Sequence, residues 1–395
     1  MTVAKKMIEF NQGASWIRKM FEEGMRLKAR YGEDQVFDFS LGNPDLPPPP
    51  EFDQTVRRLT DGHDPNLHRY MPNAGYPQVR SRIAAKVSVE QGMTVDGQGV
   101  VMTCGAAGGL NVILKALLDP GDEVIVIAPY FVEYLFYIDN HGGTARVVAA
   151  GKDFGLDLPA IAGALTSRTK SIIINSPNNP TGQIYPAQDL AELGRILSAA
   201  GERFGTTVYL IADEPYRKIV FDGHQTPSVF RHYQNSLVVS SFSKDLSLPG
   251  ERIGFIACHP EITDLSELMD AMTLANRILG FVNAPALMQR AVAELTDRAV
   301  DCAAYARRRE LFCRVLAQAG YDFLPPKGAF YLFPQSPLAD ELRFIDILKG
   351  HRILAVPGRG FGTPGYFRLA FCVPEQTIER SAPAFKAALE ASRKG

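Results

Sequence analysis

The segment around Lys244 combines residue types that could do carbonyl chemistry beside an anion. The apolar residues 237–239 predict a buried parallel strand, and serines and Lys244 follow it directly. Groups in this position lie outside the carboxyl end of the sheet, where a partly desolvated lysine loses its proton and can form a Schiff base with a carbonyl. The hydroxyls of Ser241 and Ser243 and the planar fork of Arg252 could bind a phosphate. An ordinary lysine in a solvated turn is the simpler alternative, but the pattern is denser than the composition requires.

Two other polar motifs also follow predicted buried strands. Residues 171–175 lead into a turn with the letters N-P-T-G, whose Asn179 offers an amide donor to a ligand oxygen. Asp213 ends the apolar run 207–212, and a carboxylate at the end of a buried strand is costly unless a cation pairs with it. A purely structural turn and a satisfied core aspartate are the alternatives.

Two motifs near the C-terminus lead to different conclusions. Arg368 interrupts the apolar strand predicted for residues 366–371, and a buried arginine favours a bidentate carboxylate, either of a ligand or of a structural ion pair. Residues 360–365 satisfy the pattern G-x-G-x-x-G, but they contain a proline and precede a strand, so we exclude a dinucleotide site. The seven histidines show no ligand spacing, and we predict no metal site.

These motifs, in this order, resemble the class I/II aminotransferases of fold-type I (the aspartate aminotransferase superfamily), which use pyridoxal 5′-phosphate (PLP). The resemblance runs from about residue 35 to the end of the chain. It implies that Lys244 holds the cofactor as a Schiff base and that Asp213 pairs with its pyridine nitrogen, which keeps the ring an electron sink. It also implies that Tyr216 and Asn179 contact the 3′-oxygen. Lys244, Asp213 and Tyr216 are therefore the expected catalytic residues.

Weaker segments gain roles through the same resemblance. Gly42 would approach the substrate carboxylate, and Tyr70 would cross a dimer interface to the phosphate in the neighbouring subunit. Phe131 would stack on the pyridine ring, although Tyr130 or Tyr134 could do this instead. The expected cofactor-binding residues are Tyr70, Gly105, Ala106, Ala107, Phe131, Asn179, Asp213, Tyr216, Ser241, Ser243, Lys244 and Arg252, and the expected substrate-binding residues are Gly42, Asn179 and Arg368.

The resemblance implies a ping-pong transfer of an amino group from an L-amino acid to a 2-oxo acid. Lys244 would move the proton between the substrate Cα and the cofactor. A C–S β-lyase or an aminocyclopropane-carboxylate-type synthase on the same scaffold is the nearer alternative, because the pocket decides the fate of the same carbanion. A non-enzymatic PLP or ligand sensor is the remote one. The substrate side chain is not predicted, since Arg277 is a candidate cation by location only.

Bulk properties exclude several other classes. With 46% apolar and 22% charged residues, the 395-residue chain is expected to be a soluble globular protein with a sizeable core. A net charge of -1 offers no case for nucleic acid or an anionic membrane as partner. Five scattered cysteines argue for a reducing compartment, and neither a signal peptide nor a membrane-spanning run is visible. We therefore expect a cytoplasmic protein, and the resemblance implies a homodimer that acts in amino acid metabolism.

The elements that must position these groups form an α/β fold. We expect an N-terminal arm and part of a small domain over residues 1–45, a large PLP-binding domain over 46–285, and the rest of the small α+β domain over 286–395. The resemblance to fold-type I implies a mostly parallel, seven-stranded sheet in the large domain. Residues 262–319 are expected to be helical, with one long helix spanning Leu287 to Leu316, and the arginine run 307–309 is expected to be a solvated helix face.

Overall fold

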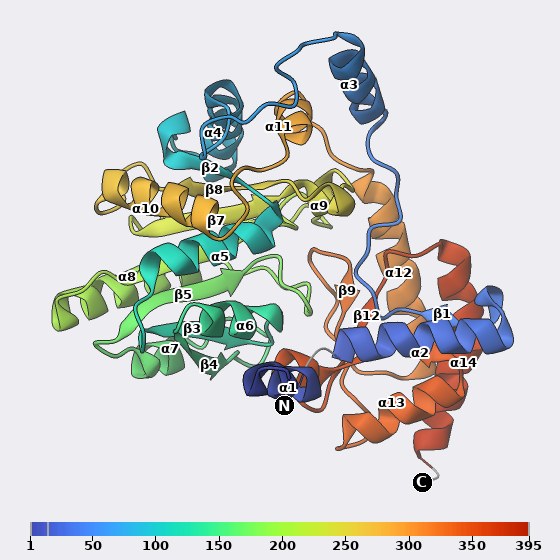
Figure 1. Ribbon diagram of the computed structural model, residues 1–395. Coiled ribbons are helices and arrows are strands. Elements are labelled where there is room, and N and C mark those ends of the chain that lie inside the picture. Colours follow the sequence, from blue (N-terminus) through green and yellow to red (C-terminus); the bar gives the residue numbers. More distant parts are fainter. Residues whose placement is uncertain (1, 14–15, 394–395) are drawn as a thin grey trace.

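The computed structural model describes residues 2–13 and 16–393. Its two lobes are a large α/β domain and a smaller α+β domain (Figure 1). The helices are α1 (Lys5–Gly13), α2 (Trp16–Tyr31), α3 (Pro50–Asp61), α4 (Pro77–Gln91), α5 (Gly105–Leu117), α6 (Glu133–Asn140), α7 (Leu158–Ala164), α8 (Ala187–Phe204), α9 (Phe242–Asp245), α10 (Leu265–Ile278), α11 (Ala286–Ala293), α12 (Cys302–Ala319), α13 (Glu341–Gly350) and α14 (Glu375–Ser392). The strands are β1 (Phe37–Asp38), β2 (Val100–Thr103), β3 (Glu123–Ala128), β4 (Thr144–Ala149), β5 (Thr169–Asn175), β6 (Tyr209–Asp213), β7 (Ser236–Ser241), β8 (Gly254–Cys258), β9 (Tyr331–Leu332), β10 (Ile353–Leu354), β11 (Val356–Pro357) and β12 (Phe367–Ala370).

The large domain contains a seven-stranded sheet in the order β2-β8-β7-β6-β5-β3-β4. All neighbouring pairs are parallel except the two that β8 makes with β2 and β7. The prediction of a mostly parallel, seven-stranded sheet is therefore confirmed.

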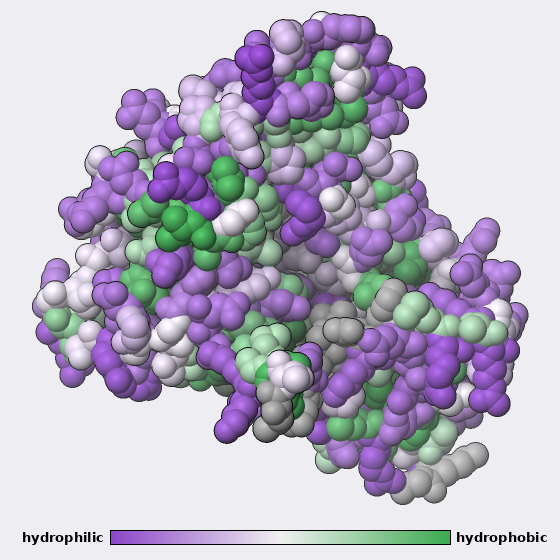
Figure 2. Space-filling model, viewed as in Figure 1, coloured by the Kyte–Doolittle hydropathy of each residue, from purple (hydrophilic) through white to green (hydrophobic). Residues whose placement is uncertain are grey.

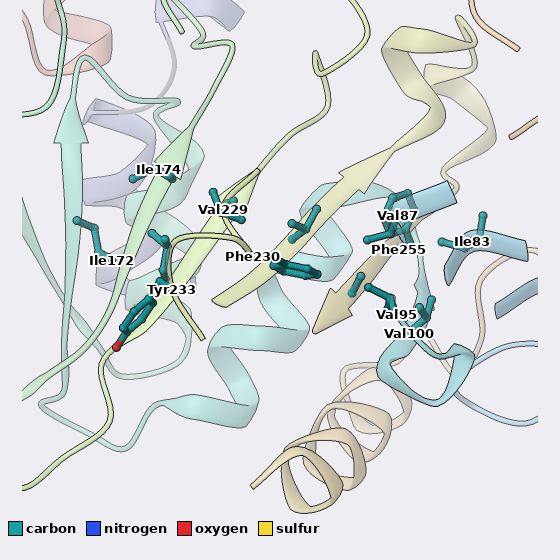
Figure 3. Close-up of a cluster of buried hydrophobic side chains, with 14 of the residues drawn as sticks. Ile83, Val87, Val95, Val100, Ile172, Ile174, Val229, Phe230, Tyr233 and Phe255 are labelled. Atoms are coloured by element: carbon teal, nitrogen blue, oxygen red, sulfur yellow. The ribbon is translucent and has the colours of Figure 1, made fainter. Parts of the chain in front are cut away.

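Both faces of this sheet are covered by helices, which explains why its strands read as continuous apolar runs. Successive residues point to opposite faces, so that Ile125 and Ile172 pack in one hydrophobic cluster and Val124 and Ile173 in another. The first cluster includes residues of α4, α7, α8 and α11, and the second includes residues of α5, α6 and α10. Figure 3 shows part of the first cluster, with side chains from α4, β5 and β8.

The small domain is built from segments near both ends of the chain, as expected for fold-type I. Strand β1 pairs in parallel with β10, while β12 lies between β11 and β9 in an antiparallel sheet. A third cluster that includes Phe39, Phe312 and Phe385 fills the space between these strands and helices α12 to α14. The described part of the chain contains no helix long and apolar enough to cross a membrane.

The prediction of one long helix from Leu287 to Leu316 is wrong, because the structure has two helices there. Helix α11 ends at Ala293, and the side chain of Asp301 accepts a hydrogen bond from the N–H of Ala303 at 2.9 Å to begin α12. The apolar periodicity continues across the break between the two helices, so it does not indicate where α11 ends. The N-cap residue Asp301 is the sequence signal for the start of α12. Met288 of α11 packs in the first cluster of the large domain. The proposed division of the chain at residues 45 and 285 stays a prediction.

The prediction of a solvated arginine face on α12 is also wrong for two of its three members. Arg308 and Arg309 are both 8% exposed. Arg308 pairs with Asp45 at 2.6 Å and Arg309 with Asp222 at 2.5 Å. A buried arginine needs such a partner, and these two tie α12 to loops that follow β1 and β6.

The N-terminal arm packs against α6. The rings of Phe10 and Phe136 lie 4.8 Å apart, and Lys6 pairs with Asp139 at 2.5 Å. Residues 1, 14 and 15 of the expected arm lie outside the described residues. Helix α1 thus lies against a helix whose first turn faces the candidate site.

Candidate active site

A cavity of about 320 Å³ lies at the carboxyl ends of the central strands. Figure 2 shows the surface hollowed where the two lobes meet. Parallel strands β3, β5, β6 and β7 are neighbours in the sheet, so the groups that follow them meet at one edge. Twelve of the predicted site residues line this cavity: Gly42, Ala106, Ala107, Phe131, Asn179, Asp213, Tyr216, Ser241, Ser243, Lys244, Arg252 and Arg368.

Lys244 lies in the short helix α9, directly after β7. Its Nζ donates a hydrogen bond to the backbone oxygen of Gly42 at 2.9 Å and faces the ring of Phe330 at 5.5 Å. No carboxylate of the described residues forms an ion pair with this amine. Burial lowers the pKa of Lys244 to about 8, so a substantial share of the amine is neutral and nucleophilic near neutral pH.

Asp213 ends β6 and is buried. Its Oδ2 accepts a hydrogen bond from the hydroxyl of Tyr134 at 2.5 Å, while its Oδ1 has no hydrogen-bond partner among the described residues. Burial raises the pKa of Asp213 to about 7. A buried carboxylate oxygen without a donor is costly, so this atom is suited to a cationic N–H group of a ligand.

Asn175 and Asn179 connect Asp213 to the turn after β5. The side chain of Asn175 donates to the backbone oxygen of Asp213 at 2.8 Å and accepts from the N–H of Asn179 at 2.7 Å. The Oδ1 of Asn179 in turn accepts from Nη1 of Arg368 at 3.1 Å. The turn is therefore held by the same groups that face the cavity.

Arg368 is 2% exposed, yet no carboxylate among the described residues pairs with it. Its Nη2 donates to the backbone oxygen of Ser40 at 2.6 Å, and its Nε has no partner among the described residues. The guanidinium lies 4.7 Å from the ring centre of Tyr331 and 4.9 Å from that of Phe361. Arg368 thus forms no structural ion pair with a described residue, which was the alternative to a ligand site. A buried guanidinium without a carboxylate partner suits a ligand carboxylate.

Tyr331 fixes the shape of this end of the cavity. Its hydroxyl lies 2.9 Å from that of Tyr216. A Cβ at residue 42 would lie 1.9 Å from the Tyr331 hydroxyl oxygen, so only glycine fits there. Gly42 thus lets the backbone approach Lys244, Tyr331 and the substrate space.

The opposite end of the cavity is suited to an anion. Ala106 and Ala107 lie in the first turn of α5, where free N–H groups and the helix dipole favour negative charge. A Cβ at Gly105 would lie 2.9 Å from the guanidinium of Arg252, which places this arginine beside the same turn. Ser241 and Ser243 add hydroxyls from the Lys244 segment. The backbone of Arg252 adopts φ 50°, a left-handed conformation that is uncommon outside glycine.

Four of the residues considered from the sequence do not line the cavity. Gly105 lies beside Arg252, which does line it. Tyr70 is 88% exposed, and Arg277 is exposed at the end of α10. Tyr130 packs against Gly362, whereas Tyr134 lines the cavity and binds Asp213.

Four cavity-lining residues with polar groups were not among the site residues predicted from the sequence: Glu133, Tyr134 (considered only as an alternative for ring stacking), Asn175 and Tyr331. Asn175 could have been found, because it ends a buried strand as Asp213 does. Tyr331 could not, since only the antiparallel pairing of β9 with β12 brings it beside Arg368.

The sheet, the second lobe and the arrangement of these side chains define an enzyme of fold-type I. Residues 34–385 match the family described as aminotransferase class I and II. The chain belongs to this family, whose members depend on PLP, and it is an aminotransferase.

Several aminotransferases are similar to the chain in sequence or structure. An aspartate/prephenate aminotransferase of Thermus thermophilus is 33% identical over 366 residues, which cover 90% of this chain and 91% of the relative. A probable aspartate/prephenate aminotransferase of Aquifex aeolicus is 31% identical, with 90% and 91% covered. A crystal structure of an aminotransferase from Eubacterium rectale superposes with a TM-score of 0.96 at 37% identity and covers 99% of both chains.

Proposed function

We propose that the cavity binds PLP and transfers an amino group from an L-amino acid to a 2-oxo acid in two half-reactions. One observation carries the proposal. The buried Oδ1 of Asp213 has no donor among the described residues, and it lies in the same cavity as a lysine whose pKa burial lowers to about 8 and an arginine that no carboxylate of the described residues pairs with. The carboxylate can pair with a protonated ring nitrogen, and the amine, when neutral, can attack a carbonyl. The guanidinium can bind an α-carboxylate.

The residues fit PLP at each of its polar groups. Asp213 would pair with the ring nitrogen, and Tyr216 and Asn179 would contact the 3′-oxygen. The phosphate would take the anion site of Arg252, Ser241, Ser243 and the first turn of α5, and Phe131 would cover the ring. When bound, PLP supplies a ring that accepts the electron pair left after the substrate Cα proton departs.

The chain's own groups would then bind the substrate and move its proton. Arg368 holds the α-carboxylate, with Asn179 and the Ser40 backbone orienting the guanidinium. The Nζ of Lys244 would take the Cα proton as general base and return it as general acid. Its position 2.9 Å from the Gly42 oxygen keeps the amine at the substrate end of the cavity.

We further propose a cytoplasmic homodimer with shared active sites. Tyr70 supports this arrangement, because it is 88% exposed on the isolated chain, although a tyrosine usually buries much of its ring. In the dimer it would contact the cofactor phosphate of the partner.

Covalent trapping tests the anchoring of the cofactor. The PLP-loaded protein is reduced with borohydride, digested and analysed by mass spectrometry, and Lys244→Ala is treated in parallel. We expect a reduced PLP adduct on the wild-type peptide that contains Lys244 and none on the variant. An adduct on another lysine, or none on the wild type, would remove Lys244 from its proposed role.

A further inference from the structure

Glu133 is an acidic side chain that the proposed chemistry does not use. It begins α6 and lines the same cavity as Lys244 and Arg368. Its Oε2 is buried and has no hydrogen-bond partner among the described residues. Burial raises the pKa of Glu133, and the charge of Arg368 opposes this shift. A glutamate that lines this cavity thus keeps one buried carboxyl oxygen without a donor among the described residues.

The other charged groups around the cavity already have partners or roles. Arg252 belongs to the anion site, Lys244 to the carbonyl and Arg368 to the α-carboxylate, and the lining residues of the described chain include no further lysine or arginine. On the outer side of α6, Lys6 pairs with Asp139 and not with Glu133.

This charge distribution disfavours a substrate with a second carboxylate. Such a group would find no free cation among the described lining residues and would meet the carboxylate of Glu133 in a poorly solvated space. A side chain that ends in a cation would instead give the buried Oε2 of Glu133 a donor. Tyr137, one turn further along α6, has its pKa raised by burial and then by the charge of Glu133, so it is a neutral neighbour.

We propose that Glu133 determines the substrate side chain, and that the amino donors of this enzyme carry a cationic end, an amine or a guanidinium, instead of a second carboxylate. This inference rests on the proposed function, because it takes Arg368 as the site of the α-carboxylate. This substrate preference would distinguish the chain from the relatives that are named for aspartate, which are only about a third identical to the chain.

Equilibrium binding of two unreactive probes tests the charge preference. Glutarate and 4-guanidinobutanoate both offer a carboxylate to Arg368 and carry no amine that could react with PLP, but they end in opposite charges. Titration calorimetry on the PLP-loaded enzyme measures their dissociation constants for the wild type and for Glu133→Gln, which keeps the shape and removes the charge. Glu379→Gln makes the same change on the exposed surface of α14 and is the matched control.

We expect the wild type to bind 4-guanidinobutanoate at least about tenfold more tightly than glutarate, and Glu133→Gln to reduce this ratio by about tenfold or more. The Glu379→Gln control should keep the wild-type ratio. A wild type that prefers glutarate, or a ratio unchanged in Glu133→Gln, would overturn the inference. Trapping of PLP at Lys244 distinguishes the two failures, because an adduct at Lys244 together with an unchanged ratio refutes only the role of Glu133.

Discussion

Burial moves the two central ionisable groups toward neutral pH from opposite sides. It lowers the pKa of Lys244 to about 8 and raises that of Asp213 to about 7. Both groups can therefore change protonation state close to the pH at which an enzyme works. The cation missing from Asp213 and the carboxylate missing from Arg368, among the described residues, indicate that a ligand completes the site.

The low pKa of Lys244 predicts the pH dependence of cofactor capture by the apoprotein. Only the neutral amine attacks a carbonyl, so the rate should rise about tenfold per pH unit below 8 and level off above it. Stopped-flow absorbance after mixing apoprotein with PLP measures this rate, and N-acetyllysine under the same conditions corrects for the ionisations of PLP itself. A rate that keeps rising to pH 10 would mean that the amine has an ordinary pKa.

At the residue scale, the sequence predicted most of the groups that end strands, Asn175 excepted, and missed those placed by tertiary pairing. Asp213, Asn179 and Lys244 each follow a recognisable buried strand, so their meeting at one edge of the sheet could be expected. Glu133 gave no such signal, because a glutamate in the first turn of a helix is ordinary. Its unpaired oxygen becomes visible only when its neighbours are known.

At the scale of elements, strands were predicted better than helices. A fully buried parallel strand is a short apolar run with turn residues at both ends, and β3, β5, β6 and β7 all match this description. Helical periodicity says less about where a helix stops, and the break between α11 and α12 depends on the Asp301 cap and on a backbone bond from Val300 to Asp245 at 2.7 Å. The buried faces of Arg308 and Arg309 likewise depend on loops distant in sequence.

At the scale of the molecule, the proposed dimer makes a prediction about mixed subunits. If Tyr70 serves the neighbouring site, Tyr70→Ala and Lys244→Ala should each have low activity at limiting PLP, because each variant damages every site of its own dimer. In a random mixture about half of the dimers contain one chain of each variant, and each of these has one site with both Lys244 and the partner's Tyr70. Activity should therefore recover to about a quarter of the wild type. The assay is aminotransfer after co-expression of the two variants.

The control is each variant expressed alone, with light scattering to establish that both have the mass of two chains. Absence of recovery in mixed dimers of that mass would place Tyr70 outside the partner's site.

The proposed function requires this site to take an amino group from an amino acid before any 2-oxo acid is present. The PLP-loaded protein is mixed with one amino acid at a time, without a 2-oxo acid, while its visible absorbance and the released products are followed. We expect a loss of the visible band, release of about one 2-oxo acid per site, and return of the band when a 2-oxo acid is added. A band that persists while pyruvate, ammonia or a thiol accumulates over many turnovers would show a lyase and contradict the proposed aminotransfer.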